Sequence, residues 1–217
     1  MNSPIIFLDD GRWLLPTSTW RGWKGECPNG MKMVAFVSYD EGKTWPEYMD
    51  VMADTENQLI FWESKILQMS DGRLLATAWT HDEKNGTDRE NSYAVSNREG
   101  NAFGAVHSTG IKGQTLTPYL LEDGSILSVY RRLDKEGLWA NISRLEGDTW
   151  INETSVCLWG KEAQNLVSRE KNMVTNFQKL QFGAPHICKL NASTLFLSFW
   201  AVEECIGHIK WCMLRVV

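Results

Sequence analysis

The sequence predicts an all-β fold built from four-stranded antiparallel units that repeat every roughly 50 to 60 residues. Three observations predict it. A hairpin with an Asp-Gly turn recurs, a motif of serine, glycine and an aromatic residue alternates with it, and long helical periodicity is absent. A unit of this kind is a β-propeller blade, so we expect about four blades. The expected single domain covers residues 1–217, with blades over roughly 1–55, 56–110, 111–160 and 180–217.

The Asp-Gly hairpin has three full copies and one degenerate copy. Its glycines are Gly11, Gly72 and Gly124, each flanked by apolar runs, and 190–194 carries Leu-Asn-Ala-Ser-Thr in the fourth copy. Asp-Gly between apolar runs is a strong hairpin signal, because a type I′ turn needs positive φ at its centre. The copies therefore predict the turn that joins the first and second strands of each blade.

The second motif predicts the turn between the third and fourth strands. In Ser38–Trp45, Ser-Tyr-Asp-Glu-Gly-Lys-Thr-Trp, glycine follows serine by four residues and the aromatic residue follows glycine by three. The same spacing recurs at Ser96, Gly100 and Phe103, and at Ser143, Gly147 and Trp150. Glycine supplies a left-handed turn, the aromatic ring packs beneath it, and serine and aspartate bond loop amides.

The two turns alternate in a fixed order, which a β-sandwich with similar turns would lack. Glu162–Val174 alone is expected to form a short helix or an irregular loop. The last copy of the repeat closes with 209–217, which supplies a third strand and no fourth. Open blade edges invite pairing with another chain, so we expect a homo-oligomer or a missing partner segment.

The motif at Ser38–Trp45 resembles the Asp box, S-x-D-x-G-x-T-W, of the sialidase (neuraminidase) superfamily and its bacterial neuraminidase repeats. The other two copies are partial, since Arg98 and Leu145 stand where the aspartate should be. The resemblance implies a propeller, in which Asp boxes lie on the face away from the active site. The family has six blades and about four are countable here, so the chain resembles a shortened or incomplete propeller.

One face of such a propeller gathers the loops that follow the second strand and those that precede the first. The carboxylates expected there, as candidates for catalysis, are Glu63, Asp82 and Glu203. The candidates for sugar binding are Arg21, Trp62, His81, Tyr130, Arg131, Arg132 and Trp200. Flat rings stack on the apolar face of a sugar, while charged groups bind its hydroxyls or a carboxylate. Because Arg131 and Arg132 are adjacent in a strand, at most one of them can point inward.

Trp20, Trp79 and Trp200 are expected at equivalent blade positions, where a packing role competes with ligand stacking. The family's catalytic set of three arginines, a tyrosine nucleophile with its glutamate, and an aspartate acid cannot be carried over. The Arg-Ile-Pro motif that opens the family's first blade is absent, and the nearest segment is Ser3-Pro4-Ile5.

The resemblance therefore implies a sialidase-like glycoside hydrolase that acts on a terminal sugar of a glycan. Two alternatives stay open, namely a propeller that binds glycan or protein without catalysis, and a truncated, inactive sialidase-like protein. The expected partner is a carbohydrate.

The composition excludes several other classes. A net charge of −5 argues against a nucleic-acid-binding surface, and no apolar run is long enough for a membrane span. The four histidines are scattered without ligand spacing, so we expect no metal and no cofactor. Met1–Pro4 lacks the basic start and cleavage site of a signal peptide. The five cysteines, without CxxC spacing, read as mostly buried residues of a reducing compartment, and a cytoplasmic location is expected.

Overall fold

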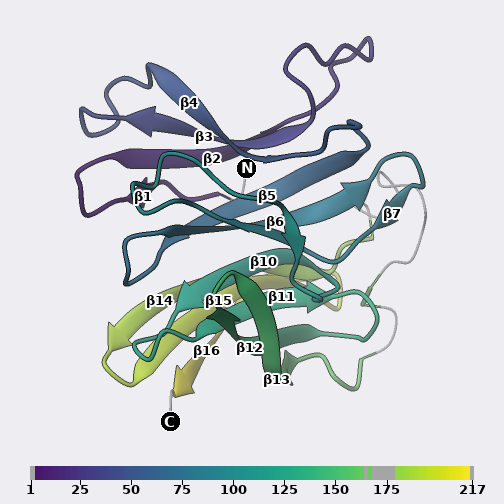
Figure 1. Cartoon of the computed structure of the whole chain (residues 1–217). Coiled ribbons are helices and arrows are strands. Elements are labelled where there is room, and N and C mark those ends of the chain that lie inside the picture. The colour runs from purple at the N-terminus through teal and green to yellow at the C-terminus, as the bar shows by residue number, and fades with distance from the viewer. Residues whose placement is uncertain (1–2, 164–165, 168–178, 216–217) are drawn as a thin grey trace.

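The computed structural model describes residues 3–163, 166–167 and 179–215, and within these ranges it contains strands and no helix (Figure 1). The short helix or irregular loop expected over 162–174 lies largely outside the described residues. In the described part of the chain, no helix is long and apolar enough to cross a membrane.

The strands form four antiparallel sheets in chain order. The first sheet contains β1 (Ile6–Phe7), β2 (Trp13–Thr19), β3 (Lys32–Ser38) and β4 (Glu47–Ala53). The second contains β5 (Leu59–Gln68), β6 (Leu74–Asp82), β7 (Thr87–Asp88), β8 (Ser92–Val95) and β9 (His107–Ser108). The third contains β10 (Gly113–Leu120), β11 (Ile126–Arg132), β12 (Leu138–Glu146) and β13 (Thr149–Trp159). The fourth contains β14 (Phe182–Asn191), β15 (Thr194–Glu203) and β16 (Ile206–Arg215).

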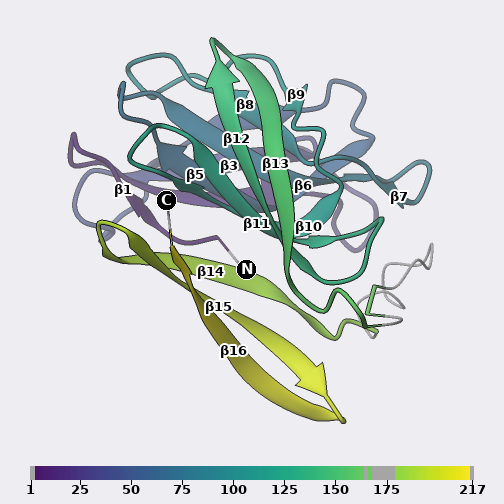
Figure 2. The same cartoon turned by 90° about the horizontal axis from the view of Figure 1, so that it is seen from below.

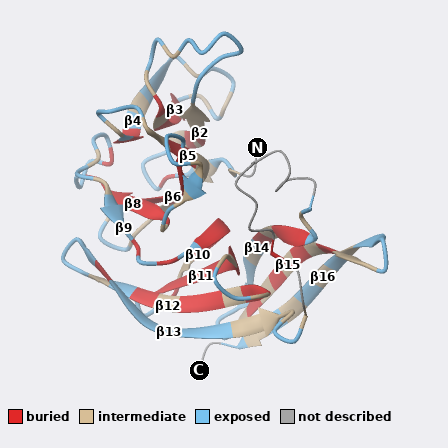
Figure 3. Cartoon of the chain, turned by 90° about the vertical axis from the view of Figure 1, so that its right-hand side faces the viewer, coloured by how far each residue is buried: buried red, intermediate tan, exposed pale blue. Residues whose placement is uncertain are grey.

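The inner strands of successive sheets lie next to one another. Contacts join β2 to β5, β5 to β10, and β10 to β14, while the later strands of each sheet spread outward (Figure 3). The predicted fold class, an all-β chain of antiparallel blade-like sheets, is confirmed. The arrangement brings β5, β10 and β14 to a common centre.

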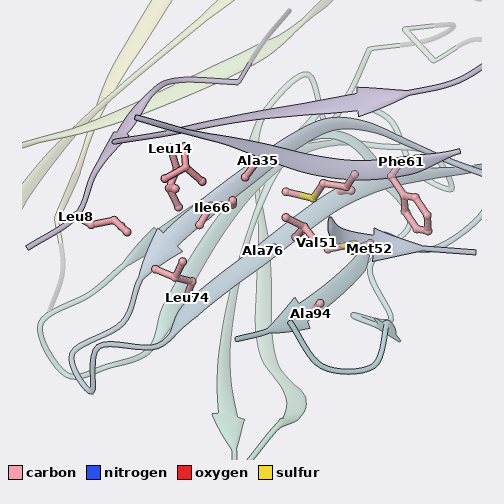
Figure 4. Close-up of a cluster of buried hydrophobic side chains, with 13 residues drawn as sticks. Leu8, Leu14, Ala35, Val51, Met52, Phe61, Ile66, Leu74, Ala76 and Ala94 are labelled. Atoms are coloured by element: carbon pink, nitrogen blue, oxygen red, sulfur yellow. The ribbon is translucent and has the colours of Figure 1, made fainter. Parts of the chain in front are cut away.

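The sheets pack on one another through apolar faces. Between the first and second sheets, alternate residues of β2 and β3, such as Leu14 and Ala35, meet Phe61 and Ile66 of β5 (Figure 4). A second cluster joins the third and fourth sheets around Phe182. Alternation along each strand directs these side chains to one face, as an amphipathic strand pattern requires.

The three Asp-Gly hairpins share one geometry, which is not the predicted type I′ turn. In the first, Gly11 N–H donates to Leu8 O at 3.0 Å and Leu8 N–H donates to Arg12 O at 2.9 Å. Only the glycine has positive φ, 89° at Gly11, while Asp10 before it does not. The turn is therefore a type I turn followed by a glycine bulge, and Asp10 accepts a hydrogen bond from Arg12 N–H instead of adopting the left-handed conformation.

Replacing Gly72 with alanine is expected to destabilise the protein by about 1–2 kcal/mol, because φ is 87° there and an L-residue is strained in that region. A Cβ at Gly72 would meet only Arg98 O, at 3.9 Å, so the cost would come from the backbone and not from a clash. Urea unfolding measures the change. Gly207→Ala, which has open space and no positive φ, is the control, and equal effects would refute the explanation.

The loop at Ser38–Trp45 is organised as its side chains predict. Ser38 Oγ accepts a hydrogen bond from Gly42 N–H at 2.9 Å and donates to Asp40 Oδ1 at 2.8 Å. Thr44 donates to Asp40 through its amide at 2.8 Å and its hydroxyl at 2.7 Å. The amide of Thr44 contributes most to lowering the pKa of Asp40 to about 2. This loop joins β3 to β4 and serves structure.

The two partial copies of this motif depart from it. In the second, Asn97 Oδ1 takes the place of the missing aspartate and accepts a hydrogen bond from Asn101 N–H at 3.1 Å. In the third, Ser143 lies within β12, and Glu146 pairs directly with Thr149, which leaves a two-residue hairpin. The spacing therefore predicted the position of the turn correctly. The hydrogen bonds inside the turn depend on which side chain can accept one from the loop amides.

The fourth sheet has three strands among the described residues, as the last repeat predicted, and β16 is its outer strand (Figure 2). The side chains of Ile209 and Trp211 are 75% and 60% exposed on that strand. The prediction that the cysteines are mostly buried is wrong. Cys188 and Cys205 are exposed, the other three are half-buried, and all five are free thiols. Cys27 and Cys205 lie in loops, and Cys157 and Cys212 lie on the outer strands β13 and β16, which leaves them partly open to solvent.

Candidate functional site

The three strands at the centre carry a β-bulge at the same place. The register shifts directly after Trp62 in β5, after Gln114 in β10 and after Gly183 in β14. The next residue of each strand has positive φ: Glu63 at 47°, Thr115 at 56° and Ala184 at 49°. Such backbone strain in residues other than glycine costs about 1–3 kcal/mol and is concentrated at functional sites. The repeated bulge therefore marks the centre as the candidate site.

Each bulge follows a cross-strand pair: Trp62 with Trp79, Gln114 with Arg131, and Gly183 with Trp200. The equivalence of Trp79 and Trp200 agrees with the sequence prediction, and Arg131 holds the same position in the third sheet. The placement of Trp20 in this set is wrong. In the first sheet Ser18, and not Trp20, follows the hairpin glycine by the same seven residues.

Glu63 is the predicted catalytic carboxylate that the structure places at this centre. Its Oε2 atom is buried and has no hydrogen-bond partner among the described residues. Burial raises the pKa of Glu63, and the nearby charges of Lys65 and Arg131 oppose that rise. A carboxyl with a raised pKa keeps its proton closer to neutral pH, as a general acid must.

Lys65 is the second unpaired charge at the centre. Its side chain is buried, and Nζ has no hydrogen-bond partner among the described residues. Burial lowers the pKa of Lys65 to about 8, while the charge of Glu63 opposes the shift. Buried polar groups without partners are costly unless water or a ligand satisfies them. A polar ligand that hydrogen-bonds to Glu63 and Lys65 would remove this cost, so these two residues mark the point where such a ligand would bind most favourably.

A chain of hydrogen bonds joins the second, third and fourth sheets around Arg131. His81 Nδ1 lies 2.7 Å from Asp88 Oδ1, and Gln114 Nε2 donates to Asp88 Oδ2 at 2.6 Å. Arg131 donates to Gln114 Oε1 through Nε at 3.0 Å and Nη2 at 2.5 Å, and through Nη1 to Phe182 O at 2.6 Å. Burial lowers the pKa of Arg131 to about 10. Arg131 thus holds the centre together.

Gly183 makes room for this guanidinium. A Cβ at that position would lie 2.6 Å from Arg131 Nη1 and 3.7 Å from Trp200 Nε1. Because Arg131 Nη1 and Trp200 Nε1 both lie close to this one position, Trp200, which is predicted to bind sugar, lies beside Arg131 at the same centre.

Aromatic rings from the first two sheets form a cluster next to Glu63. The Trp62 ring stacks on His81, with centroids 5.1 Å apart and an interplanar angle of 18°. Its edges meet Trp79 at 5.0 Å and Trp20 at 6.5 Å. Trp79 and His81 are buried, whereas Trp20 is 56% exposed, so the cluster runs from the interior to the surface.

Three predicted site residues lie in surface ion pairs or loop contacts instead. Asp82 is buried but accepts hydrogen bonds from Asn85 and Arg89, led by the Asn85 side chain, which lower its pKa to about 2. Glu203 binds Lys210 at 2.5 Å, and that bond lowers its pKa. Arg21 binds Glu83 at 2.9 Å. A proton donor at neutral pH needs a raised pKa, so Asp82 and Glu203 lack the property that Glu63 has.

Arg132 and Tyr130 lie on the face of β11 that points away from Arg131, as alternation requires. Arg132 pairs with Asp134 at 2.6 Å, and its guanidinium carbon lies 4.6 Å from the centroid of the Trp139 ring. Tyr130 is buried in the apolar cluster between the second and third sheets, and burial raises its pKa.

Sequence reasoning missed Lys65 and Asp88, and it expected Gln114 on this face without giving it a role. Lys65 and Gln114 each lie one or two positions from a bulge, and a polar residue at that point of an apolar strand is the signal that could have found them. Asp88 comes from β7, a two-residue strand with no motif of its own. It also lines a groove of about 600 Å³ whose other walls include Leu59, Thr80 and Lys112, so the buried network reaches solvent there.

The described residues contain no group of three or more histidine, cysteine, aspartate or glutamate side chains that could hold a metal ion.

The whole fold is similar to solved glycan-processing enzymes. A protein of unknown function from Dyadobacter fermentans has a TM-score of 0.71 at 20% identity, over 98% of this chain and 52% of its own. A β-1,3-galactosidase of family GH43 has a TM-score of 0.64 at 11% identity, over 99% of this chain and 45% of its own. The leech intramolecular trans-sialidase has a TM-score of 0.59 at 15% identity, over 94% and 29%.

These likenesses establish the fold. It is the β-propeller fold of glycoside hydrolases, both GH43 enzymes and a sialidase. The chain spans about half the length of the first two proteins that it matches. No family model matches the sequence, and the comparison with curated proteins finds no match.

Proposed function

We propose that this protein is a glycoside hydrolase with Glu63 as its proton donor. The observation that carries the proposal is the carboxyl of Glu63, whose buried Oε2 atom has no hydrogen-bond partner among the described residues, held by a strained bulge at the point where three sheets meet. Its raised pKa suits the protonation of a glycosidic oxygen. The fold is shared with glycoside hydrolases, which supports a glycan as the ligand.

The second carboxylate of this proposal is Asp88, in place of the sequence candidates Asp82 and Glu203. The charges of Glu63 and Asp88 both raise the pKa of Arg131 against the effect of burial, so the two carboxylates lie within electrostatic range of one guanidinium. The pair of carboxylates on either side of the scissile bond is the arrangement that glycoside hydrolysis requires.

A neutral terminal sugar is favoured over sialic acid. Recognition of a sugar carboxylate calls for guanidinium groups with free donors. Arg21 is paired with Glu83, and Arg132 is paired with Asp134. Three of the N–H groups of Arg131 already donate to Gln114 and Phe182. Trp62 and Trp200 instead offer rings for the apolar face of a sugar.

The second candidate is a glycan-binding protein without catalysis. It is favoured by the state of Asp88, because His81 and Gln114 engage one carboxylate oxygen each. A carboxylate in that state is poorly placed to activate water.

Hydrolysis of 4-nitrophenyl glycosides of galactose, xylose, arabinose and sialic acid separates these functions. We expect turnover of a neutral glycoside and none of the sialoside. Turnover of the sialoside alone would show that the protein is a sialidase. Binding of a sugar without any turnover would establish the non-catalytic function. Absence of both binding and turnover across the panel would refute the proposal.

Replacing Lys65 with methionine is expected to move the alkaline limb of the pH–rate profile to higher pH. A general acid acts protonated, so activity falls as pH rises through the pKa of Glu63. The charge of Lys65 favours ionised Glu63, and its removal raises that pKa further. Lys210→Met, at the surface beside Glu203, should leave the limb in place. A limb that stays or moves to lower pH in Lys65→Met would contradict this role.

A further inference from the structure

The loop between β2 and β3 presents two tryptophans to solvent. Trp20 is 56% exposed and Trp23 is fully exposed. Burying a side chain of this size stabilises a protein by about 2 kcal/mol or more, so two exposed indoles on one short loop forgo a large gain. Large apolar surface left exposed next to a polar centre is typical of a binding site.

Hydrogen bonds hold the loop that carries them. Gly22 N–H donates to Glu26 O at 2.8 Å, and Lys24 N–H donates to the Glu26 carboxylate at 2.8 Å. At the base, Thr19 Oγ1 donates to Gly30 O at 2.7 Å. The contact of Arg21 with Glu83 then ties the loop to the second sheet. Trp23 is therefore a solvent-exposed side chain on a turn that is ordered by hydrogen bonds.

Trp20 connects this loop to the candidate site. Its ring meets the edge of Trp62 at 6.5 Å with an interplanar angle of 86°, and Trp62 directly precedes Glu63 in β5. The aromatic cluster thus runs from β5, the strand that carries Glu63, outward to the loop, which projects beyond the end of the first sheet (Figure 1).

The loop also borders an open hollow whose walls are partly polar and partly apolar. Its volume is about 360 Å³, and its lining residues include Ser18, Thr19, Trp20 and Asn29. Hydroxyl and amide groups next to an indole are the combination that a pyranose needs, since its hydroxyls lie at the ring edge and its C–H groups at the ring face.

We propose that Trp20, Trp23 and this hollow form a second sugar-binding site, which holds the sugar next to the one at Glu63. The inference rests on the proposed function, and it makes the ligand an oligosaccharide instead of a single sugar on a small leaving group. Ring stacking on Trp23 supplies affinity, while the central carboxyl acts on the bond between the two sugars.

Calorimetric titration with galactose, xylose, arabinose and their linear trisaccharides tests the inference. The Glu63→Gln variant is the host protein, so that the ligand survives the measurement. We expect one trisaccharide to bind at least tenfold more tightly than its monosaccharide, and Trp23→Ala to abolish that gain while the monosaccharide affinity changes less than twofold. Trp211→Ala, which removes an indole of similar exposure from β16, is the matched control and should leave both affinities unchanged.

The outcomes separate this inference from the proposed function. Trisaccharide binding that survives in Trp23→Ala, or that falls equally in Trp211→Ala, overturns the second site alone. Equal affinity for the monosaccharide and the trisaccharide does the same. If neither sugar binds the protein, the proposed function fails and the second site fails with it. Since Trp23 makes no buried contact, a loss in Trp23→Ala with an unchanged melting temperature cannot be attributed to misfolding.

Discussion

Replacing Glu63 with glutamine is expected to reduce the hydrolysis of a neutral glycoside by at least 100-fold. Proton transfer by a positioned side chain contributes about 10²–10⁴-fold to rate, and glutamine keeps the shape of the side chain without its proton. Because Oε2 already lacks a hydrogen-bond partner among the described residues, the amide breaks no existing contact. The turnover number with a disaccharide, whose leaving sugar must take up a proton as the glycosidic bond breaks, measures the effect.

Glu203→Gln is the matched control for this experiment. Glu203 binds Lys210 at the surface, so its replacement should change the rate less than about threefold, the small effect expected of an exposed ion pair. A large loss in Glu203→Gln with an active Glu63→Gln would contradict the assignment and would favour the carboxylate at the end of β15. The pH–rate profile adds a second check, since the alkaline limb should disappear together with the Glu63 carboxyl.

Replacing Arg131 with alanine is expected to destabilise the protein by about 4 kcal/mol. The substitution leaves a cavity and removes the donors of Gln114 Oε1 and Phe182 O, and each buried acceptor that loses its partner costs about 1–3 kcal/mol. It also removes the positive charge that interacts electrostatically with Glu63 and Asp88. Urea unfolding at neutral pH measures the change.

The neighbouring arginine provides the control. Arg132→Ala removes an ion pair with Asp134 and a contact with Trp139 at the surface, which together are worth about 1 kcal/mol. Equal destabilisation by the two variants would show that the network around Arg131 does not hold the sheets. Arg131→Met restores part of the lost volume, so the difference between methionine and alanine separates the cavity from the hydrogen bonds.

Local patterns predicted the turns, because a tight turn is decided by few residues. Gly72 and Gly42 mark positions where φ is positive, and the sequence located both. The predicted turn type was wrong at the Asp-Gly hairpins, since aspartate there accepts a hydrogen bond from the amide two residues later and only glycine becomes left-handed. The three strands of the fourth sheet among the described residues agree with the count of strands in the last repeat.

The candidate site was predicted in part. Glu63, Trp62 and Arg131 were expected at this centre because the repeats had located the strands that carry them. Asp82 and Glu203 were expected there for the same reason, yet they end their strands and their neighbours Arg89 and Lys210 engage them. No pattern in the residues around a carboxylate tells which of the two environments it will meet.

The amino-acid sequence was enough to predict the repeated antiparallel sheets, their hairpins and the candidate carboxylate Glu63. The folded chain was needed to show that Glu63 Oε2 lacks a partner while Asp82 has two, and that Gln114 and Arg131 connect His81 to Phe182. The difference comes from the range of the interactions involved. A turn depends on residues a few positions apart, whereas burial and hydrogen bonding at the centre depend on strands from three sheets that meet only when the chain has folded.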